Sequence, residues 1–113
     1  MSFKLFKGVV SILLLAFSAF FATIKGENYA LLISGSNHYW NYRHQADICH
    51  AYHVLLQAGM KAENIVVMTY DDAPFHPKNP FPGQLFNTPD GDDVNKGCVK
   101  DYTAKDVNKA NFI

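Results

Sequence analysis

Several features that mark common classes of protein are missing from this 113-residue sequence. It has two cysteines, Cys49 and Cys98, too few for the disulfide framework of a small secreted domain. The patterns Gly-x-Gly-x-x-Gly and Gly-Lys-Ser/Thr are both absent, so the run at residues 35–37 is not a phosphate loop. There is no internal repeat and no low-complexity tract. The sequence therefore indicates neither a repeat protein nor a phosphate-loop enzyme.

A basic stripe is missing as well. Residues 26–113 contain seven Lys and Arg against ten Asp and Glu, so this part is mildly acidic. That balance argues against nucleic acid as a partner. The composition is otherwise ordinary for a globular protein, so we do not expect a disordered chain.

Residues 1–25 are the part of the chain that we do not assign to the fold. Lys4 and Lys7 precede an apolar run at residues 9–22, which is followed by small residues. This predicts a cleaved secretory signal peptide, and the alternative is an uncleaved membrane anchor. The run is shorter than the roughly 20 residues that a membrane span prefers. We expect membrane contact only through this segment, and a domain at residues 26–113 in the secretory pathway.

If the chain enters the secretory pathway, its two cysteines lie in an oxidising compartment. A disulfide between Cys49 and Cys98 is allowed there, but a single pair does not imply one. A Cys in an apolar helical stripe, as Cys49 is, is also a common small core residue.

The hydrophobic pattern predicts an α/β unit. Residues 29–33 and 65–70 are continuous apolar runs, typical of strands buried on both faces of a parallel sheet. Between them, apolar residues recur every three to four positions from 43 to 58, which predicts a helix that ends at Gly59. Strand, helix and strand at this spacing form a βαβ unit with parallel strands.

The rest of the chain contains fewer regular signals. Residues 73–97 are rich in Pro and Gly, so we expect a long loop, with a short hairpin around Leu85 and Phe86. Phe75, Phe81 and Phe86 indicate that this loop packs against the domain. Thr103 and Asp106 have the spacing of a capping box, and Asn108 is the alternative cap for a last helix. Two strands and one helix leave strand edges open, so we expect the N-terminal part of a larger domain.

The candidate site is the loop at residues 34–44, at the carboxyl end of the first strand, where open α/β sheets bind ligands. It contains the only Arg of the chain, Arg43, beside Asn41 and His44. An Arg guanidinium suits a carboxylate or carboxamide ligand. The alternative is a structural ion pair with one of the Asp residues, and the sequence leaves both interpretations open.

Other polar clusters favour structural interpretations. Asp71 and Asp72 follow the second strand, on the same sheet edge as the loop; we expect one to cap the next turn and the other to face solvent. His50 and His53 are three residues apart, as metal ligands can be, but no third ligand is marked by spacing. We therefore predict surface histidines, no metal and no cofactor.

The chain resembles the legumain family, the asparaginyl endopeptidases also called vacuolar processing enzymes (peptidase family C13). The resemblance covers roughly residues 29–113. It rests on matching runs at residues 35–37, 41–47, 49–52, 65–68, 70–72, 79–80, 82–83, 93–94, 100–103, 106–107 and 111–112.

The resemblance implies a caspase-like α/β fold, with a mostly parallel sheet flanked by helices. It also implies a cysteine endopeptidase that cleaves peptides after Asn, and sometimes Asp, in vacuoles or lysosomes. Asn41 would orient the catalytic His, and Arg43 with His44 would bind the substrate Asn side chain.

The sequence departs from the family pattern in ways that bear on activity. The His-Gly and Glu-Ala-Cys-Glu-like motifs of the catalytic His and Cys do not occur, so we expect an N-terminal portion that is inactive alone. His38 replaces a usual Gly, and Cys98 with Val99 stands where the family tends to have Val-Pro. The alternatives are a fragment of the catalytic subunit of the GPI-anchor transamidase and a truncated, secreted, non-enzymatic relative.

Overall fold

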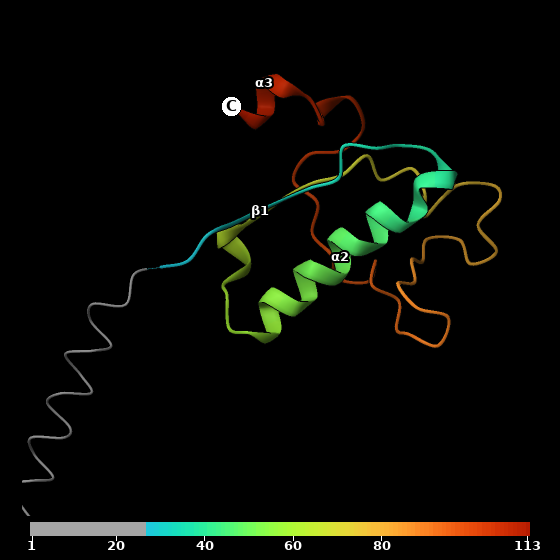
Figure 1. Cartoon of the computed structure of the whole chain (residues 1–113), viewed down its shortest axis with the longest axis horizontal. Coiled ribbons are helices and arrows are strands. Elements are labelled where there is room, and N and C mark those ends of the chain that lie inside the picture. The colour runs from blue at the N-terminus through green and yellow to red at the C-terminus, as the bar shows by residue number, and fades with distance from the viewer. Residues whose placement is uncertain (1–26) are drawn as a thin grey trace, which may run out of the picture.

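The computed structural model describes residues 27–113, so the signal peptide expected at residues 1–25 lies outside the described residues. Two strands, one long helix and several short helical turns make up this part of the chain (Figure 1). In chain order they are β1 (Ala30–Ile33), η1 (Tyr39–Asn41), α2 (Tyr42–Gln57), η2 (Ala62–Asn64), β2 (Ile65–Met68), η3 (Ala104–Asp106) and α3 (Lys109–Phe112).

The predicted βαβ unit is confirmed. β1 and β2 pair in parallel, with Ala30 opposite Ile65 and Ile33 opposite Met68. A later segment runs along the free side of β2: the Asp101 carboxylate accepts the N–H of Val67 at 2.8 Å, and Tyr102 N–H donates to the Val67 carbonyl at 3.1 Å. The outer edge of β2 is therefore covered by this segment.

Helix α2 begins one residue before its predicted start and ends one residue before its predicted end. Gly59 follows it with a φ of 94°, which glycine adopts without steric cost. The N–H of Gly59 donates to the Leu56 carbonyl and the N–H of Met60 donates to the Leu55 carbonyl, each at 3.0 Å. This pair of bonds is a Schellman motif, so the predicted Gly cap is confirmed.

The core lies between α2 and one face of the sheet. Cys49 and Tyr52 of the helix pack in one buried cluster with Ile65 and Val67 of β2, and Leu85 joins them from the long loop. Most of the opposite face is open in the described part of the chain, where Leu31 is 47 % exposed and Ile33 and Val66 are exposed too, whereas Met68 at its end is buried. Strands buried on both faces were therefore a wrong prediction: successive side chains alternate between faces, and α2 covers one of them.

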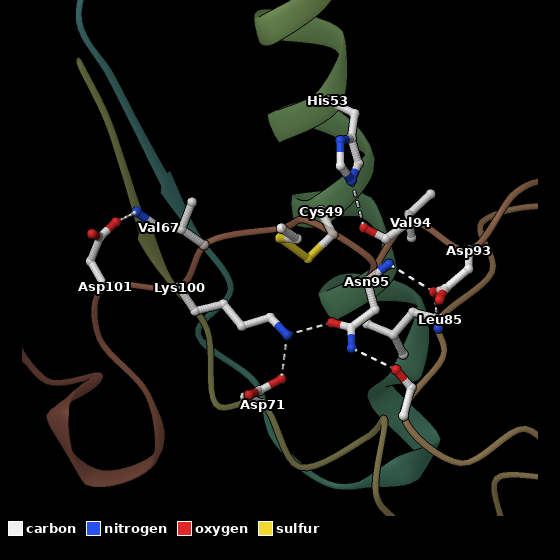
Figure 2. Close-up of a disulfide and its surroundings, with 12 residues drawn as sticks. Cys49, His53, Val67, Asp71, Leu85, Asp93, Val94, Asn95, Lys100 and Asp101 are labelled. Atoms are coloured by element: carbon white, nitrogen blue, oxygen red, sulfur yellow. Dashed lines mark hydrogen bonds and ion pairs between the residues drawn. A yellow bond between two sulfur atoms is a disulfide. The ribbon is translucent and has the colours of Figure 1, made fainter. Parts of the chain in front are cut away.

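A disulfide joins Cys49 of α2 to Cys98, with an S–S distance of 2.12 Å (Figure 2). Both sulfurs lie inside the cluster between the helix and residues 94–100. The pairing that the sequence left open is thus formed, and it ties the end of the long loop to the helix.

Residues 73–97 form the expected long connection without helix or strand. Its hairpin is reduced to one antiparallel bridge, Phe86 with Asp93. The expected packing of the Phe side chains is wrong for Phe75 and Phe81, which are exposed. The loop is organised instead by polar contacts, because the buried Asn79 amide donates to the carbonyls of neighbouring turns.

The capping box at Thr103 does not form, since the Thr103 side chain makes no capping bond. Asn108, the alternative, caps α3: its side-chain oxygen accepts the N–H of Asn111 at 2.9 Å. Within residues 27–113, no helix is long and apolar enough to cross a membrane.

Candidate functional site

The loop at residues 34–41 and the Asp71-Asp72 pair lie together beyond the carboxyl ends of the two parallel strands. The N–H of His38 donates to the Asp72 carboxylate at 2.7 Å, which joins the two segments directly. The expectation that they share one sheet edge is confirmed. The three predicted site residues sit on the loop side of this contact, where the loop enters α2.

Asn41 occupies the N-cap position of α2, but its side chain does not cap the helix. Its Nδ2 instead donates to the Asn37 carbonyl at 2.8 Å, and the residue is half-buried. The amide therefore has a defined orientation within the loop, with its oxygen left to accept a further hydrogen bond.

Arg43 is exposed in the first turn of α2. One guanidinium N–H donates to the Trp40 carbonyl at 3.1 Å. All ten acidic residues of the chain lie within residues 27–113, and none of them forms an ion pair with Arg43. Of the two interpretations of Arg43, the structural ion pair is thus not supported, and most of its N–H donors have no hydrogen-bond acceptor among residues 27–113.

His44 is half-buried, and its Nδ1 lies 2.6 Å from the Ser36 hydroxyl oxygen. The ring lines an open hollow of about 440 Å³ at the end of β1, together with Ser34, Asp47 and Ile48. The Ser36 contact fixes the ring orientation and leaves Nε2 for a ligand.

The structure brings Asn41, Arg43 and His44 into one loop-to-helix junction, although no hydrogen bond joins any two of them. Asn41 and His44 are three positions apart and so lie on neighbouring sites of the helix surface, whereas Arg43 is rotated away from Asn41. The junction therefore presents a cation and an imidazole beside an oriented amide.

The neighbour Tyr42 links this junction to the long loop. Its hydroxyl accepts the N–H of Phe86 at 2.6 Å. Burial raises the pKa of Tyr42 above its ordinary value, and the hydrogen bond from Phe86 opposes only part of that effect. Tyr42 is accordingly a neutral acceptor that holds residue 86 against the start of α2.

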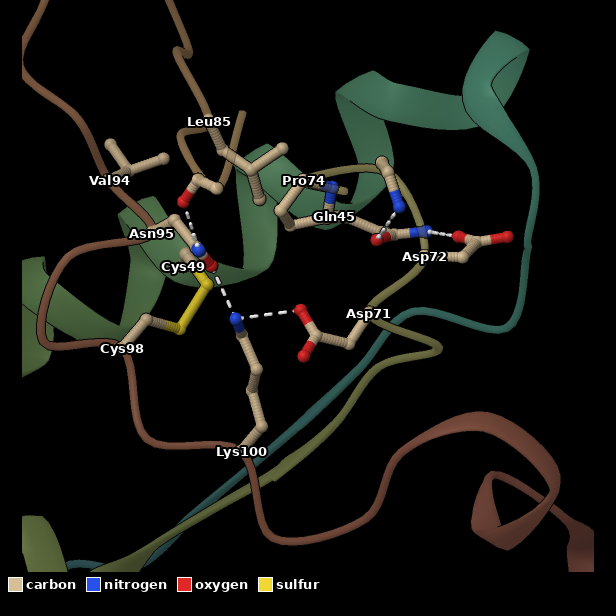
Figure 3. A network of polar contacts seen from close by, with 12 residues as sticks. Gln45, Cys49, Asp71, Asp72, Pro74, Leu85, Val94, Asn95, Cys98 and Lys100 are labelled. Carbon is tan, nitrogen blue, oxygen red and sulfur yellow. Dashed lines mark hydrogen bonds and ion pairs between the residues drawn. A yellow bond between two sulfur atoms is a disulfide. The ribbon is translucent and has the colours of Figure 1, made fainter. Parts of the chain in front are cut away.

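Gln45, for which the sequence pattern gave no role, joins Asp72 at this site. Gln45 is 1 % exposed, and its Nε2 donates to the Asp72 carboxylate at 2.6 Å (Figure 3). Asp71 forms an ion pair with Lys100 at 2.7 Å, so neither Asp caps the next turn or simply faces solvent. That expectation was wrong, because both partners come from segments distant in sequence, which local patterns do not report.

The histidines of α2 have structural partners. His50 Nδ1 lies 2.9 Å from the Asn87 side-chain oxygen, and His53 Nε2 lies 2.9 Å from the Val94 carbonyl. Among residues 27–113, no three His, Cys, Asp or Glu side chains come close enough to hold a metal ion. Both cysteines of the chain are in the disulfide, so neither supplies a thiolate.

Comparison with known proteins gives one consistent result. The model of the Peptidase C13 family matches residues 28–113. The chain is 58 % identical over 88 residues to the vacuolar-processing enzyme delta-isozyme of Arabidopsis thaliana, which covers 78 % of this chain and 19 % of the relative. It is 51 % identical over 92 residues to the hemoglobinase of Schistosoma mansoni (80 % and 21 %), and 48 % identical over 88 residues to the legumain of Mus musculus (78 % and 20 %). The chain thus spans about a fifth of the length of the curated relatives it matches.

Proposed function

The chain belongs to the peptidase C13 family, and from this premise we propose that it supplies the Asn-binding wall of a cysteine endopeptidase that cleaves after Asn. Its substrates are then peptides and proteins that present Asn, or sometimes Asp, at the cleavage site. No nucleic acid partner and no cofactor enter this proposal.

The observation that carries the proposal is the state of Arg43. It is the only Arg of the chain, it sits at a sheet edge where ligands bind, and it is paired with no carboxylate. A guanidinium donates two parallel hydrogen bonds to a planar oxygen ligand. The single carboxamide oxygen of a substrate Asn accepts one or two guanidinium N–H groups, and the carboxylate of a substrate Asp accepts the parallel pair. The ring nitrogen of neighbouring His44 is a further hydrogen-bonding group.

Asn41 has a different role in this proposal. Its Nδ2 is anchored on the Asn37 carbonyl, so its Oδ1 is held in place to accept an N–H from an imidazole. A general base works best when its ring is held in one orientation. Asn41 is thus proposed to orient the catalytic His.

The attacking thiol does not come from these 113 residues. Cys49 and Cys98 are bonded to each other, and the His-Gly and Glu-Ala-Cys motifs are absent from the sequence. We therefore propose that the 113-residue chain by itself hydrolyses no Asn peptide, because a nucleophile and its base are both required.

The proposed compartment is the secretory pathway, with delivery to a vacuole or lysosome or secretion. A disulfide persists in such oxidising compartments. Several of the relatives are named vacuolar-processing enzymes, which supports the same assignment.

The test is a chimeric protease in which residues 28–113 replace the matching segment of the Arabidopsis delta-isozyme. Cleavage of a fluorogenic peptide with Asn before the scissile bond is measured against the same peptide with Gln. We expect selective cleavage after Asn, and we expect Arg43→Ala to raise KM by about 10-fold or more, since it removes ground-state binding.

Lys109→Ala is the matched control, because Lys109 is an exposed cation on α3, away from the junction. Equal KM values for Arg43→Ala and the unsubstituted chimera would remove the role assigned to Arg43. A folded chimera that cleaves Asn and Gln peptides alike would overturn the proposed specificity.

A further inference from the structure

We propose that Asp72 is a positioning residue of this site: its carboxylate holds both ends of the segment that carries Asn41, Arg43 and His44. This inference rests on the proposed function for its catalytic consequence. Its structural part, the immobilisation of the segment, stands on contacts of the described residues and is testable without activity.

The two oxygens of the Asp72 carboxylate bind on either side of the site residues. Oδ2 accepts the backbone N–H of His38 at 2.7 Å, and Oδ1 accepts Nε2 of Gln45 at 2.6 Å. His38 directly precedes the η1 turn, and Gln45 directly follows His44. One carboxylate thus brackets residues 39–44.

The orientation of the Gln45 amide is not ambiguous. Its Oε1 accepts the backbone N–H of Ala73 at 3.2 Å, and a backbone N–H can only donate. Its Nε2 must therefore face Asp72, as Figure 3 shows for the labelled pair. Gln45 is fully buried, so this amide is held by the core as well as by its bonds.

The backbone at His38 shows why such a contact is needed. His38 has a φ of 69° and a ψ of 160°, a region that is occupied almost only by glycine. Its stacking on Trp40, with ring centroids 4.6 Å apart, is exposed and does not fix the backbone. A charge-assisted bond from the His38 N–H to Asp72 holds the loop in this costly conformation.

The neighbouring charge is compensated separately. Asp71 pairs with Lys100 at 2.7 Å, and Lys100 also donates to Asn95, on the side of the disulfide (Figure 3). Asp71 forms no hydrogen bond or ion pair with residues 38–45. Asp72 is therefore the acid that acts on the site loop, and Asp71 offers a control of identical chemistry one residue away.

The first test measures backbone hydrogen exchange by mass spectrometry in the full 113-residue chain, with Asp72→Asn and Asp71→Asn compared with the unsubstituted protein. For Asp72→Asn we expect at least about 10-fold faster exchange in peptides covering residues 36–41, with residues 65–68 of β2 unchanged. Asp71→Asn should leave residues 36–41 as they were. Equal exchange of residues 36–41 in all three proteins would overturn the inference.

The second test measures kcat and KM in the chimeric protease, and it applies also where a variant of the isolated chain unfolds. Asp72→Asn should lower kcat/KM by about 10- to 100-fold, through both a higher KM and a lower kcat, because a loose loop misplaces Arg43 and Asn41 together. Asp71→Asn should change neither kcat nor KM by more than about 2-fold.

The two possible failures are distinct. An unsubstituted chimera that cleaves no Asn peptide contradicts the proposed function, whatever the exchange data show. A chimera that is active and equally impaired by Asp72→Asn and Asp71→Asn contradicts the positioning role of Asp72.

Discussion

At the scale of single residues, the binding role proposed for Arg43 and the orienting role proposed for Asn41 correspond to different environments at the junction. Arg43 extends into solvent with one N–H on the Trp40 carbonyl, whereas Asn41 is half-buried and tied to Asn37. An exposed cation suits a group that must meet a ligand. A tethered amide suits a group that must not move during the reaction.

Asn41→Ala in the chimeric protease should lower kcat by about 10-fold while leaving KM within about 2-fold, since the role proposed for Asn41 is to orient a base and not to bind substrate. Steady-state kinetics on the Asn peptide provide the measurement. Asn111→Ala is the control, because Asn111 is exposed on α3 and its side-chain amide donates to the Asp106 carbonyl rather than to any residue of the junction. A change in KM alone would contradict the orienting role.

Tyr42→Phe removes the acceptor of the Phe86 N–H and should lower the free energy of unfolding at pH 7 by about 1 kcal/mol. Because burial raises the pKa of Tyr42, the folded state favours the protonated phenol. The stability that comes from this preference for the protonated phenol is fully present below the ordinary tyrosine pKa of about 10, and it is lost as pH rises through the raised pKa of the folded state.

The difference in stability between the unsubstituted chain and Tyr42→Phe should therefore shrink above about pH 10. Urea unfolding at several pH values, followed by circular dichroism, measures it. The comparison with Tyr42→Phe removes the contribution of the other tyrosines, which both proteins share. A difference that stays constant or grows with pH would refute the assigned protonation linkage.

At the scale of elements, the C-terminal end of α2 depends on the backbone conformation of Gly59. Gly59 and Gly35 both have open space where a Cβ would lie, but only Gly59 has a positive φ, of 94°. The two glycines therefore differ in backbone conformation and not in packing. Replacing each of them by Ala therefore measures how much a left-handed backbone at a helix end costs in free energy of unfolding.

Gly59→Ala should destabilise the chain by about 1–2 kcal/mol, because an L side chain is strained at this φ and the Schellman motif depends on it. Gly35→Ala should be neutral or slightly stabilising, since it only restricts the unfolded chain. Urea unfolding of the two variants at one pH is the measurement. Equal effects would show that the positive φ of Gly59 does not limit stability.

At the scale of the whole molecule, contacts between segments distant in the chain hold the described part together. α2 covers one face of a two-stranded sheet, and residues 101 and 102 follow the outer edge of β2. The disulfide spans 49 residues and connects α2 to Cys98, which precedes them (Figure 2). It encloses β2 and the whole of the long loop at residues 73–97 in one covalent ring.

Replacing the pair as Cys49→Ala with Cys98→Val should lower the free energy of unfolding by about 2–4 kcal/mol, since closing a ring of this size restricts the unfolded chain. Thermal unfolding of the 113-residue chain is measured with and without a thiol reductant. Reductant should lower the Tm of the unsubstituted chain but not that of the double variant. A Tm of the unsubstituted chain that is unaffected by complete reduction would contradict this account.

The elements and the family were readable from the sequence, because both depend on local or ordered patterns. The 3.6-residue period between two apolar runs predicts the βαβ unit, and Gly59 marks the helix end to within a residue or two. The ordered matches around Arg43 identify the C13 family, which the comparison confirms. Such signals need no knowledge of contacts between distant segments.

Only the tertiary structure decided the contacts between residues far apart in the chain. The sequence left the Cys49–Cys98 bond open, misjudged Asp71 and Asp72, and gave Gln45 no role. The physical reason is that parallel strands and their crossover helix bring segments 27 to 49 residues apart into contact, at the sheet edge and in the core. Packing decides which carboxylate, amide or thiol meets which partner. The contacts of Asp72 on either side of residues 39–44 could therefore be recognised only in the folded chain.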